Sequence, residues 1–310
     1  MRTIGLDLGG TKLASALVDA KGKVLKYRRE PARFDHSGGD AAKSIRAVIS
    51  QLGETVEAHY IDAKGKVRGV GLASAGPLHV ERGELINPTN FPGFGKVKII
   101  SLLEKELKKR KIRTKVYFQN DAMAAALGEG WVGGAKGLET YCVITVGTGI
   151  GSGLIYRGRP AQFAGMGGEW GLSIVQFNAA AAGNPHFGTV EGFASGTGIK
   201  RRAREAGFPG THMEELVAAI RSGKEEYRVF FQDAALALAS LCYNLSLGFH
   251  VEKILFSGGM IAIKDLFFND VLKFYREFVS VRPGFATKLA VARLGDKAGV
   301  IGAARLPWLK

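Results

Sequence analysis

The sequence contains few cysteines and no long apolar run. Of its 310 residues only two are cysteine, Cys142 and Cys242, and both lie in apolar stretches, which is typical of inert core thiols rather than of a disulfide. No stretch of roughly eighteen uncharged apolar residues could span a bilayer. The first residues enter a strand directly, without the charged and then apolar segment of a secretion leader. We therefore expect a cytoplasmic protein without a membrane partner.

Acidic residues are also scarce: 28 stand against 43 basic ones, which gives a net charge of +15. A strongly basic chain can indicate nucleic acid, a membrane surface or a polyanionic substrate. The two densest clusters have no interleaved aromatic residues and no zinc-finger, helix-turn-helix or RNP pattern beside them; they are Lys105, Lys108, Lys109, Arg110, Lys111, Arg113 and Lys115, and then Lys200, Arg201, Arg202 and Arg204. We interpret both as solvated helix ends and expect no nucleic-acid partner.

Glycine, by contrast, is abundant, and two stretches repeat one pattern. Residues 143–156 and residues 4–18 each read as a strand, a glycine-rich turn and a second strand. Glycines in such a turn can adopt positive φ and let a ligand approach the main-chain N–H groups, so a phosphate chain is the expected ligand. A tight hairpin that merely needs glycine is the alternative. Neither turn opens a helix and no Gly-Lys-Ser or Gly-Lys-Thr occurs, which excludes a Walker loop and a dinucleotide fingerprint.

Asn120 and Asp121 follow a short apolar strand and precede residues 122–129, a strong helix-forming segment. Asp121 is therefore expected at or near a helix N-terminus, either as an ordinary N-cap or as a carboxylate that faces a ligand at the strand end. The positive end of the helix is expected to keep its carboxylate ionised. Both roles are compatible.

Periodicity places strands and helices in alternation along the chain. Strands are expected at 3–7, 13–18, 24–28, 67–73, 115–118, 253–256 and 289–292, and helices after Asp40 and at 102–109, 122–129, 198–206, 213–221, 227–247 and 295–304. This alternation predicts an α/β protein.

Six motifs follow one another along the chain: Asp7 to Lys12, Asn120-Asp121, Gly147 to Gly153, Gly168-Glu169, Glu191 to Gly196, and Ser257 to Met260. In this order they resemble the ROK-family sugar kinases of the actin-like ATPase superfamily. The resemblance implies an α/β, ribonuclease H-like fold of two lobes with ATP and a sugar in the cleft. It also implies a small domain over residues 1–118, a large domain over 119–294, and a C-terminal helix at about 295–310 that returns to the first.

The same resemblance assigns roles to residues. Asp121 would be the general base, Asn90, Asn120, Glu169 and Glu191 would contact the sugar with it, and Asp7 would organise Mg²⁺ through water. The residues expected to bind ATP are Gly9, Gly10, Thr11, Lys12, Gly147, Thr148, Gly149 and Gly151 at the phosphates, and Gly258 and Gly259 at the adenosine. Lys12 either touches phosphate or points to solvent along its strand.

The chain departs from the family where most members hold a structural zinc. Leu172 stands where the resemblance leads one to expect a histidine, and residues 177–188 contain no cysteine. A thiolate-rich tetrahedral site cannot be built from these residues, so no structural zinc is expected, and His186 is interpreted as a loop histidine. The family histidine also contacts the sugar, and its replacement leaves the identity of the substrate open.

The leading hypothesis is ATP-dependent phosphorylation of a hexose or related sugar hydroxyl, as in a glucokinase. The alternative is a catalytically weak sugar-binding or sensing homologue; a DNA-binding domain does not fit before Ile4. Glycoside hydrolysis by Glu169 and Glu191 would leave both glycine turns unexplained. Polyphosphate as donor stays open, and the resemblance suggests a homodimer.

Overall fold

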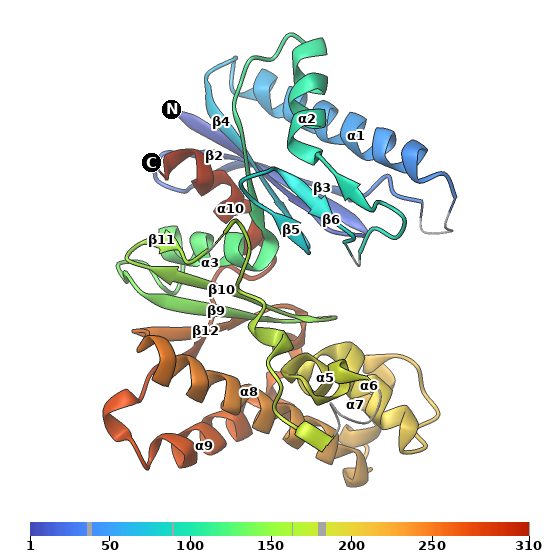
Figure 1. Cartoon of the computed structure of the whole chain (residues 1–310), viewed down its shortest axis with the longest axis vertical. Helices are drawn as coiled ribbons and strands as arrows, with labels where there is room; N and C mark the ends of the chain where they lie inside the picture. The colour runs from blue at the N-terminus through green and yellow to red at the C-terminus, as the bar shows by residue number, and fades with distance from the viewer. Residues whose placement is uncertain (36–38, 89, 163, 179–183, 310) are drawn as a thin grey trace. The chain divides into compact units, whose positions relative to one another are not determined.

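The computed structural model describes residues 1–309 apart from 36–38, 89, 163 and 179–183 (Figure 1). The chain divides into two compact units. Unit 1 comprises Met1–Glu139, Gly153–Gly168 and Arg293–Lys310, and unit 2 comprises Thr140–Ser152 and Glu169–Ala292. The boundaries of these compact units do not fall at residue 118. The division into domains over residues 1–118 and 119–294 stays a prediction.

Unit 1 is built on a five-stranded sheet with the strand order β3-β2-β1-β4-β8. The first three strands pair antiparallel, whereas β1 pairs with β4, and β4 with β8, in parallel. Its elements are β1 Arg2–Leu8, β2 Lys12–Asp19, β3 Val24–Pro31, α1 Ala41–Asp62, β4 Val67–Ser74, α2 Ile99–Lys109, β8 Val116–Asn120, α3 Asp121–Val132, η6 Gly295–Lys297, α10 Ala298–Arg305 and η7 Leu306–Trp308. A small sheet is formed by β5 Leu78–His79, β6 Glu84–Ile86 and β7 Lys96–Val97.

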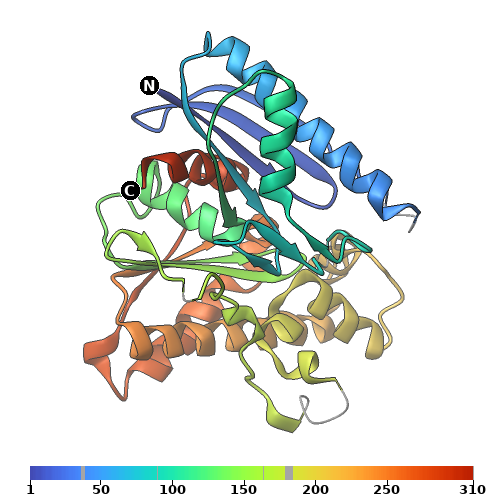
Figure 2. The same ribbon diagram turned by 45° about the horizontal axis from the view of Figure 1, so that its top comes forward.

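Helices cover both faces of this sheet, and the alternation of side chains along β1 decides which residues meet them. Ile4, Leu6 and Leu8 are buried with residues of α1 and α2 in one hydrophobic cluster. The intervening residues Gly5 and Asp7 point to the other face, where α10 packs. Figures 1 and 2 show α10, in red, on the opposite side of the sheet from α1 and α2.

Close packing of α10 depends on glycine. A Cβ on Gly71 of β4 would collide with the Ala303 carbonyl of α10, and one on Gly302 of α10 would collide with the Ala124 carbonyl of α3. In both views α10 lies against α3 (Figures 1 and 2). The C-terminal helix is therefore held between the sheet and the helix that begins at Asp121.

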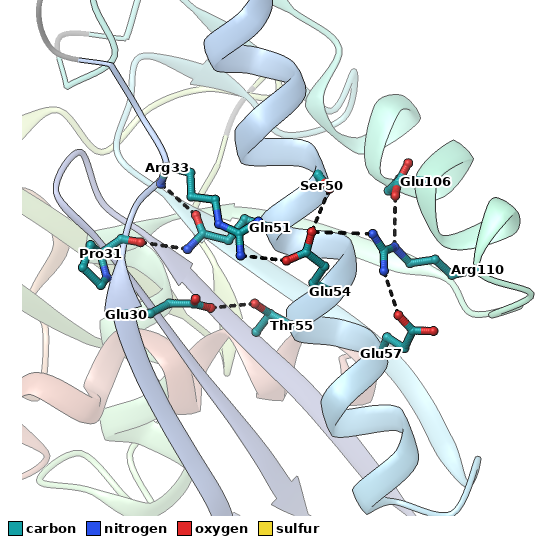
Figure 3. Close-up of polar contacts among 10 residues, drawn as sticks. All are labelled: Glu30, Pro31, Arg33, Ser50, Gln51, Glu54, Thr55, Glu57, Glu106 and Arg110. Carbon is teal, nitrogen blue, oxygen red and sulfur yellow. Dashed lines mark hydrogen bonds and ion pairs between the residues drawn. The ribbon is translucent and has the colours of Figure 1, made fainter.

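A polar network joins β3, α1 and α2 on the outer side of unit 1 (Figure 3). Arg110, just after α2, contacts Glu57 at 2.7 Å, Glu106 at 3.0 Å and Glu54 at 3.8 Å. Glu54 in turn pairs with Arg33 at 2.7 Å and accepts a hydrogen bond from Ser50 at 2.9 Å. Arg110 thus has carboxylate partners on α1 and α2, whereas the sequence suggested only a solvated helix end.

Unit 2 contains three parallel strands, β9 Tyr141–Val146, β12 Lys253–Ser257 and β13 Lys288–Val291. Within the unit their order is β9-β12-β13. The chain passes from unit 2 into unit 1 along β10 Ile150–Tyr156, which pairs antiparallel with β11 Arg159–Pro160. The helices α8 and α9 pack against each other below the three parallel strands in Figure 1. The remaining elements are η1 Trp170–Leu172, η2 Pro185–Gly188, α5 Val190–Ala194, α6 Gly196–Glu205, α7 Met213–Arg221, η3 Glu225–Arg228, α8 Val229–Phe249, η4 Gly259–Leu266, α9 Phe268–Val279 and η5 Pro283–Phe285.

The strands and helices expected from periodicity are all present, with ends that differ by a few residues. Asp40 is the N-cap of α1, and its side chain accepts a hydrogen bond from Lys43 N–H at 3.1 Å. Ser195 caps α6 in the same way through Gly198 N–H at 2.9 Å. After Ser257 the chain continues as the 3₁₀ helix η4.

Candidate active site

Asn120 and Asp121 lie where β8 ends and α3 begins. Oδ1 of Asn120 accepts hydrogen bonds from Ala122 N–H at 2.9 Å and Met123 N–H at 3.3 Å. Asp121 is the first helical residue, and its Oδ1 also accepts from Ala122 N–H, at 2.8 Å. The N-cap is therefore Asn120 and not Asp121, because Asn120 has the extended backbone (φ −64°, ψ 147°) that an N-cap requires.

Asp7 lies near the end of β1, on the face of the sheet that α10 covers. Its carboxylate contacts Gly299 in the first turn of α10, where a Cβ would collide with Oδ2 of Asp7. Glycine at 299 therefore provides the space that this carboxylate occupies. The sequence drew attention to this helix only as the element that closes the chain; its glycines at 295, 299 and 302 were the available signal of close packing.

The carboxyl groups of Asp7 and Asp121 influence one another. Burial, followed by the charge of Asp121, raises the pKa of Asp7 to about 7, while the charge of Lys12 opposes the shift. Burial also raises the pKa of Asp121, although hydrogen bonds from backbone N–H groups act in the opposite direction. The helix N-terminus was expected to lower the pKa of Asp121, but removal of the carboxylate from water raises it by more. Raised carboxyl pKa values of this kind cluster at functional sites.

The β1–β2 turn contains Gly9, Gly10, Thr11 and Lys12. It is closed by a hydrogen bond from Gly9 N–H to the Lys12 carbonyl at 2.9 Å. A Cβ on Gly10 would lie 2.8 Å from the Asn90 carbonyl oxygen, so unit 1 brings the predicted phosphate turn beside a predicted sugar residue. Thr11, Lys12 and Asn90 are exposed.

The β9–β10 turn of unit 2 is built around Glu191. The carboxylate of Glu191, on α5, accepts a hydrogen bond from Ile150 N–H at 2.8 Å, and a Cβ on Gly149 would lie 2.6 Å from it. Gly147 donates to the Gly149 carbonyl at 3.0 Å and accepts from Gly196 N–H at 2.8 Å.

Of the two expected reasons for glycine in these turns, positive φ is not used, and close approach of a ligand to the N–H groups stays a prediction. None of the turn glycines adopts the left-handed backbone, and this holds for Gly9, Gly10, Gly147, Gly149 and Gly151. What Gly10 and Gly149 provide is room for Asn90 and Glu191. Thr148 at the tip of the β9–β10 turn is exposed.

Two further predicted segments lie elsewhere in unit 2. Glu169 is exposed and immediately precedes η1. Gly258 has φ +94° and packs against the backbone of Val146, and Gly259 begins η4, so here a left-handed glycine is required for the chain to turn after β12.

Gln119 is a site neighbour that the sequence did not reveal. Its side chain is 2% exposed, its Oε1 accepts a hydrogen bond from Asn120 N–H at 2.7 Å, and its amide pairs reciprocally with Gln162 at 2.9 Å. A buried glutamine at a strand end was the available signal, but its partner lies 43 residues away.

No group of three or more His, Cys, Asp or Glu side chains could hold a metal ion among the described residues. Mg²⁺ does not require one, since one or two carboxylates, waters and substrate phosphates commonly hold it. Asp7 fits that pattern, because it is a carboxyl group with a second one, Asp121, close enough for its charge to raise the pKa of Asp7.

The predicted zinc-free loop falls partly on residues 179–183, which lie outside the described residues. Leu172, at the position where a histidine was expected, ends η1 and is 43% exposed. His186 is exposed on η2. The absence of a structural zinc stays a prediction.

Comparison with known proteins identifies the chain's family. The model of the ROK family matches residues 3–308. The chain is 28% identical to a glucokinase of Thermotoga maritima, an alignment that covers 99% of this chain and 97% of the relative. It is 26% identical to an N-acetylmannosamine kinase of Haemophilus influenzae, with 100% and 96% covered. The solved structure of a ROK hexokinase from Thermus thermophilus superposes with a TM-score of 0.85 at 30% identity and covers 100% of this chain and 98% of its own.

The chain therefore belongs to the ROK family, and the α/β actin-like ATPase fold expected from its motifs is confirmed. Over the part of the chain that the structure describes, no helix is long and apolar enough to cross a membrane.

Proposed function

We propose that this chain is an ATP-dependent sugar kinase, which transfers the γ-phosphoryl group of ATP to a hydroxyl of a hexose or related sugar. The observation that carries the proposal is the pair of Asp7 and Asp121, two carboxyl groups with raised pKa values where β1 and β8 of unit 1 end. The glucokinase, N-acetylmannosamine kinase and hexokinase relatives support the class of reaction. Because their sugars differ, they leave the substrate of this chain open.

In this proposal Asp121 is the general base. Its ionised carboxylate accepts the proton of the attacking sugar hydroxyl while the new O–P bond forms and the bond between the γ-phosphorus and the bridging oxygen breaks, which releases ADP. A pKa raised toward neutrality strengthens a carboxylate as a base, provided that it is ionised at the working pH. Phosphoryl transfer otherwise asks the protein for positioning and charge stabilisation.

The remaining predicted residues would position the reactants. The side-chain oxygen of Asn120 is used in capping α3, so its amide N–H groups are the part that would hydrogen-bond a sugar hydroxyl. Asn90, Glu169 and Glu191 would contact the sugar as well. Backbone N–H groups of the two glycine turns, with Thr11, Lys12 and Thr148, would bind the phosphates, and Gly258 and Gly259 the adenosine.

Mg²⁺ is the proposed metal. It would be held through water by Asp7, and when bound it supplies positive charge that offsets the phosphate oxygens of ATP. The Asp7 carboxylate, which would accept hydrogen bonds from those waters, lies against Gly299.

The proposal is tested by measuring ADP release from ATP and Mg²⁺ with glucose, mannose, fructose, allose, N-acetylglucosamine and N-acetylmannosamine. A signal with one sugar that Asp121→Asn removes would support the kinase and name its substrate. Polyphosphate in place of ATP tests the alternative donor. Size-exclusion chromatography with light scattering tests the proposed homodimer.

The second candidate is a weakly active sugar-binding homologue. It rests on Leu172, which occupies the position where a sugar-contacting histidine is expected in the family. Calorimetric sugar binding without ADP or phosphate release from any donor would favour it over the kinase.

A further inference from the structure

Unit 1 contains a cavity of about 880 Å³. It is lined by residues of β8, the connection between β5 and β6, α2, the β10–β11 turn and the chain after α10. Small-molecule sites commonly measure about 300–1,000 Å³. Within the described chain, its lining includes none of the residues that we assign to the sugar or to ATP. The proposed kinase reaction therefore leaves this cavity without an occupant.

The charge of the lining favours an anion. Its charged side chains are four arginines and two glutamates, namely Arg82, Arg157, Arg159, Arg305, Glu81 and Glu104. The arginines come from three segments that are far apart in the sequence, so the fold gathers them. A concave surface with excess positive charge attracts anions because its field is concentrated there.

Arginine suits a phosphate better than a generic anion, because its planar guanidinium donates paired N–H groups to two oxygens. Two of these guanidinium groups also stack on aromatic rings: Arg157 lies 5.2 Å from the ring centre of Tyr156, and Arg305 lies 5.1 Å from that of Trp131. Stacking restricts the side chains and lowers the entropy lost when a ligand binds.

The rest of the wall would accommodate a carbon skeleton with hydroxyl groups. Tyr117 and Trp308 are half-buried and present aromatic surface. Gln119 and Gln162 add the two amide groups that pair with each other at 2.9 Å. Aromatic surface with a few fixed polar groups is the usual composition of a small-molecule site.

We propose that this cavity is a second ligand site, which binds a phosphorylated small molecule: a phosphate monoester on a sugar-sized skeleton. The phosphate contacts the arginines at the β10–β11 turn, Arg157 and Arg159, and the skeleton lies toward Tyr117 and Trp308. This site is distinct from Asp7 and Asp121 and does not depend on kinase activity.

Isothermal titration calorimetry on the full chain tests the site with glucose 6-phosphate, inorganic phosphate and glucose. Glucose 6-phosphate should bind, and Arg159→Ala and Arg157→Ala should each weaken it about tenfold, the loss of one charge-assisted contact. Arg113→Ala, which removes an exposed arginine of unit 1 outside the cavity, should have no effect. Glu104→Gln should strengthen binding, because it removes a negative charge from the wall.

Variants at the two sites separate this cavity from the proposed active site. If Asn120→Ala weakens glucose 6-phosphate binding while both arginine variants leave it unchanged, the phosphate ester occupies the active site and the proposal is wrong. It is also wrong if neither phosphate compound binds at millimolar concentration, or if inorganic phosphate binds as tightly as glucose 6-phosphate. Because Glu104→Gln acts in the opposite direction from the arginine variants, a general loss of folding cannot reproduce the expected pattern.

Discussion

Carboxylate pKa values in unit 1 shift in opposite directions in two groups: upward for the pair of Asp7 and Asp121, and downward for Glu54 in the network around Arg110. Burial raises the pKa values of Asp7 and Asp121. In the network of Figure 3, hydrogen bonds from Arg33 and Ser50 lower the pKa of Glu54. Ionisation therefore destabilises the folded state at the first group and stabilises it at the second. A protein retains the first arrangement where chemistry needs it, so the two groups should respond in opposite ways to loss of charge.

The largest effect is expected on turnover in Asp121→Asn. The amide is nearly isosteric but cannot accept the hydroxyl proton, so turnover should fall about 10²- to 10⁴-fold while sugar binding is kept. The measurement is steady-state ADP release, with sugar affinity measured by calorimetry.

Asp40→Asn provides the matched control, since asparagine caps a helix as well as aspartate does and Asp40 is exposed. It should keep full turnover. Undiminished turnover in Asp121→Asn would mean that Asp121 is not the general base. The raised pKa values of Asp7 and Asp121 would then no longer indicate a catalytic pair.

The next effect is on stability, in Asp7→Asn. The folded pKa of Asp7, about 7, lies above the ordinary value of 3.8, so the folded state retains this proton after the unfolded state has lost it. Wild-type stability is thus lost progressively as pH rises from about 4 to 7, and the loss is complete above 7. The amide of the variant does not titrate, so the variant should be more stable than the wild type by roughly 4 kcal/mol at pH 8 and equal to it near pH 4.

Urea unfolding at several pH values measures this difference. Asp40→Asn should not show the same pH-dependent gain. A variant that is less stable than the wild type at pH 8 would mean that the Asp7 carboxylate is stabilised by its surroundings, and the contrast between the two groups would fail.

A smaller effect is expected in the pH dependence of kcat/KM, which reports on the free enzyme. Below the pKa values of the Asp7 and Asp121 pair the base is protonated, so kcat/KM should fall by about tenfold for each pH unit. Glu54→Gln should leave the profile unchanged, because Glu54 belongs to the structural network. A profile that stays flat down to the ordinary carboxyl pKa of 3.8 would contradict the raised pKa of Asp121.

The placement of Asp7 and Asn120-Asp121 could be predicted from sequence because each depends on short-range patterns. Alternation and strand length set the end of β1, and a helix-forming segment after a strand sets the start of α3. The burial of Asp7 against Gly299 could not be predicted, since it depends on α10, which lies near the far end of the chain.

The motifs did not predict which residues their own residues contact. The sequence predicted the two glycine turns as phosphate sites, which stays a prediction. The structure shows instead that Gly10 and Gly149 make room for Asn90 and Glu191 and do not adopt positive φ. Arg82, Arg157 and Arg305 carry no motif at all. Only folding brings them to one cavity.

The smallest effect is expected from Arg110→Met, which keeps the apolar stem and removes the charge at the centre of the network. Arg110 contacts carboxylates of Glu57 and Glu106 at 2.7 and 3.0 Å, and exposed pairs each contribute about 0–1 kcal/mol. The variant should therefore lose about 1 kcal/mol of unfolding free energy and keep wild-type turnover, the reverse of Asp7→Asn. Arg113→Met, at an exposed position nearby, should lose less. Urea unfolding in low and high salt measures both, and the Arg110 loss should shrink in high salt because screening weakens the pairs. If Arg110→Met instead lowered turnover without changing stability, the network would contribute to the reaction. The division into a catalytic pair, Asp7 and Asp121, and a structural network would then be wrong.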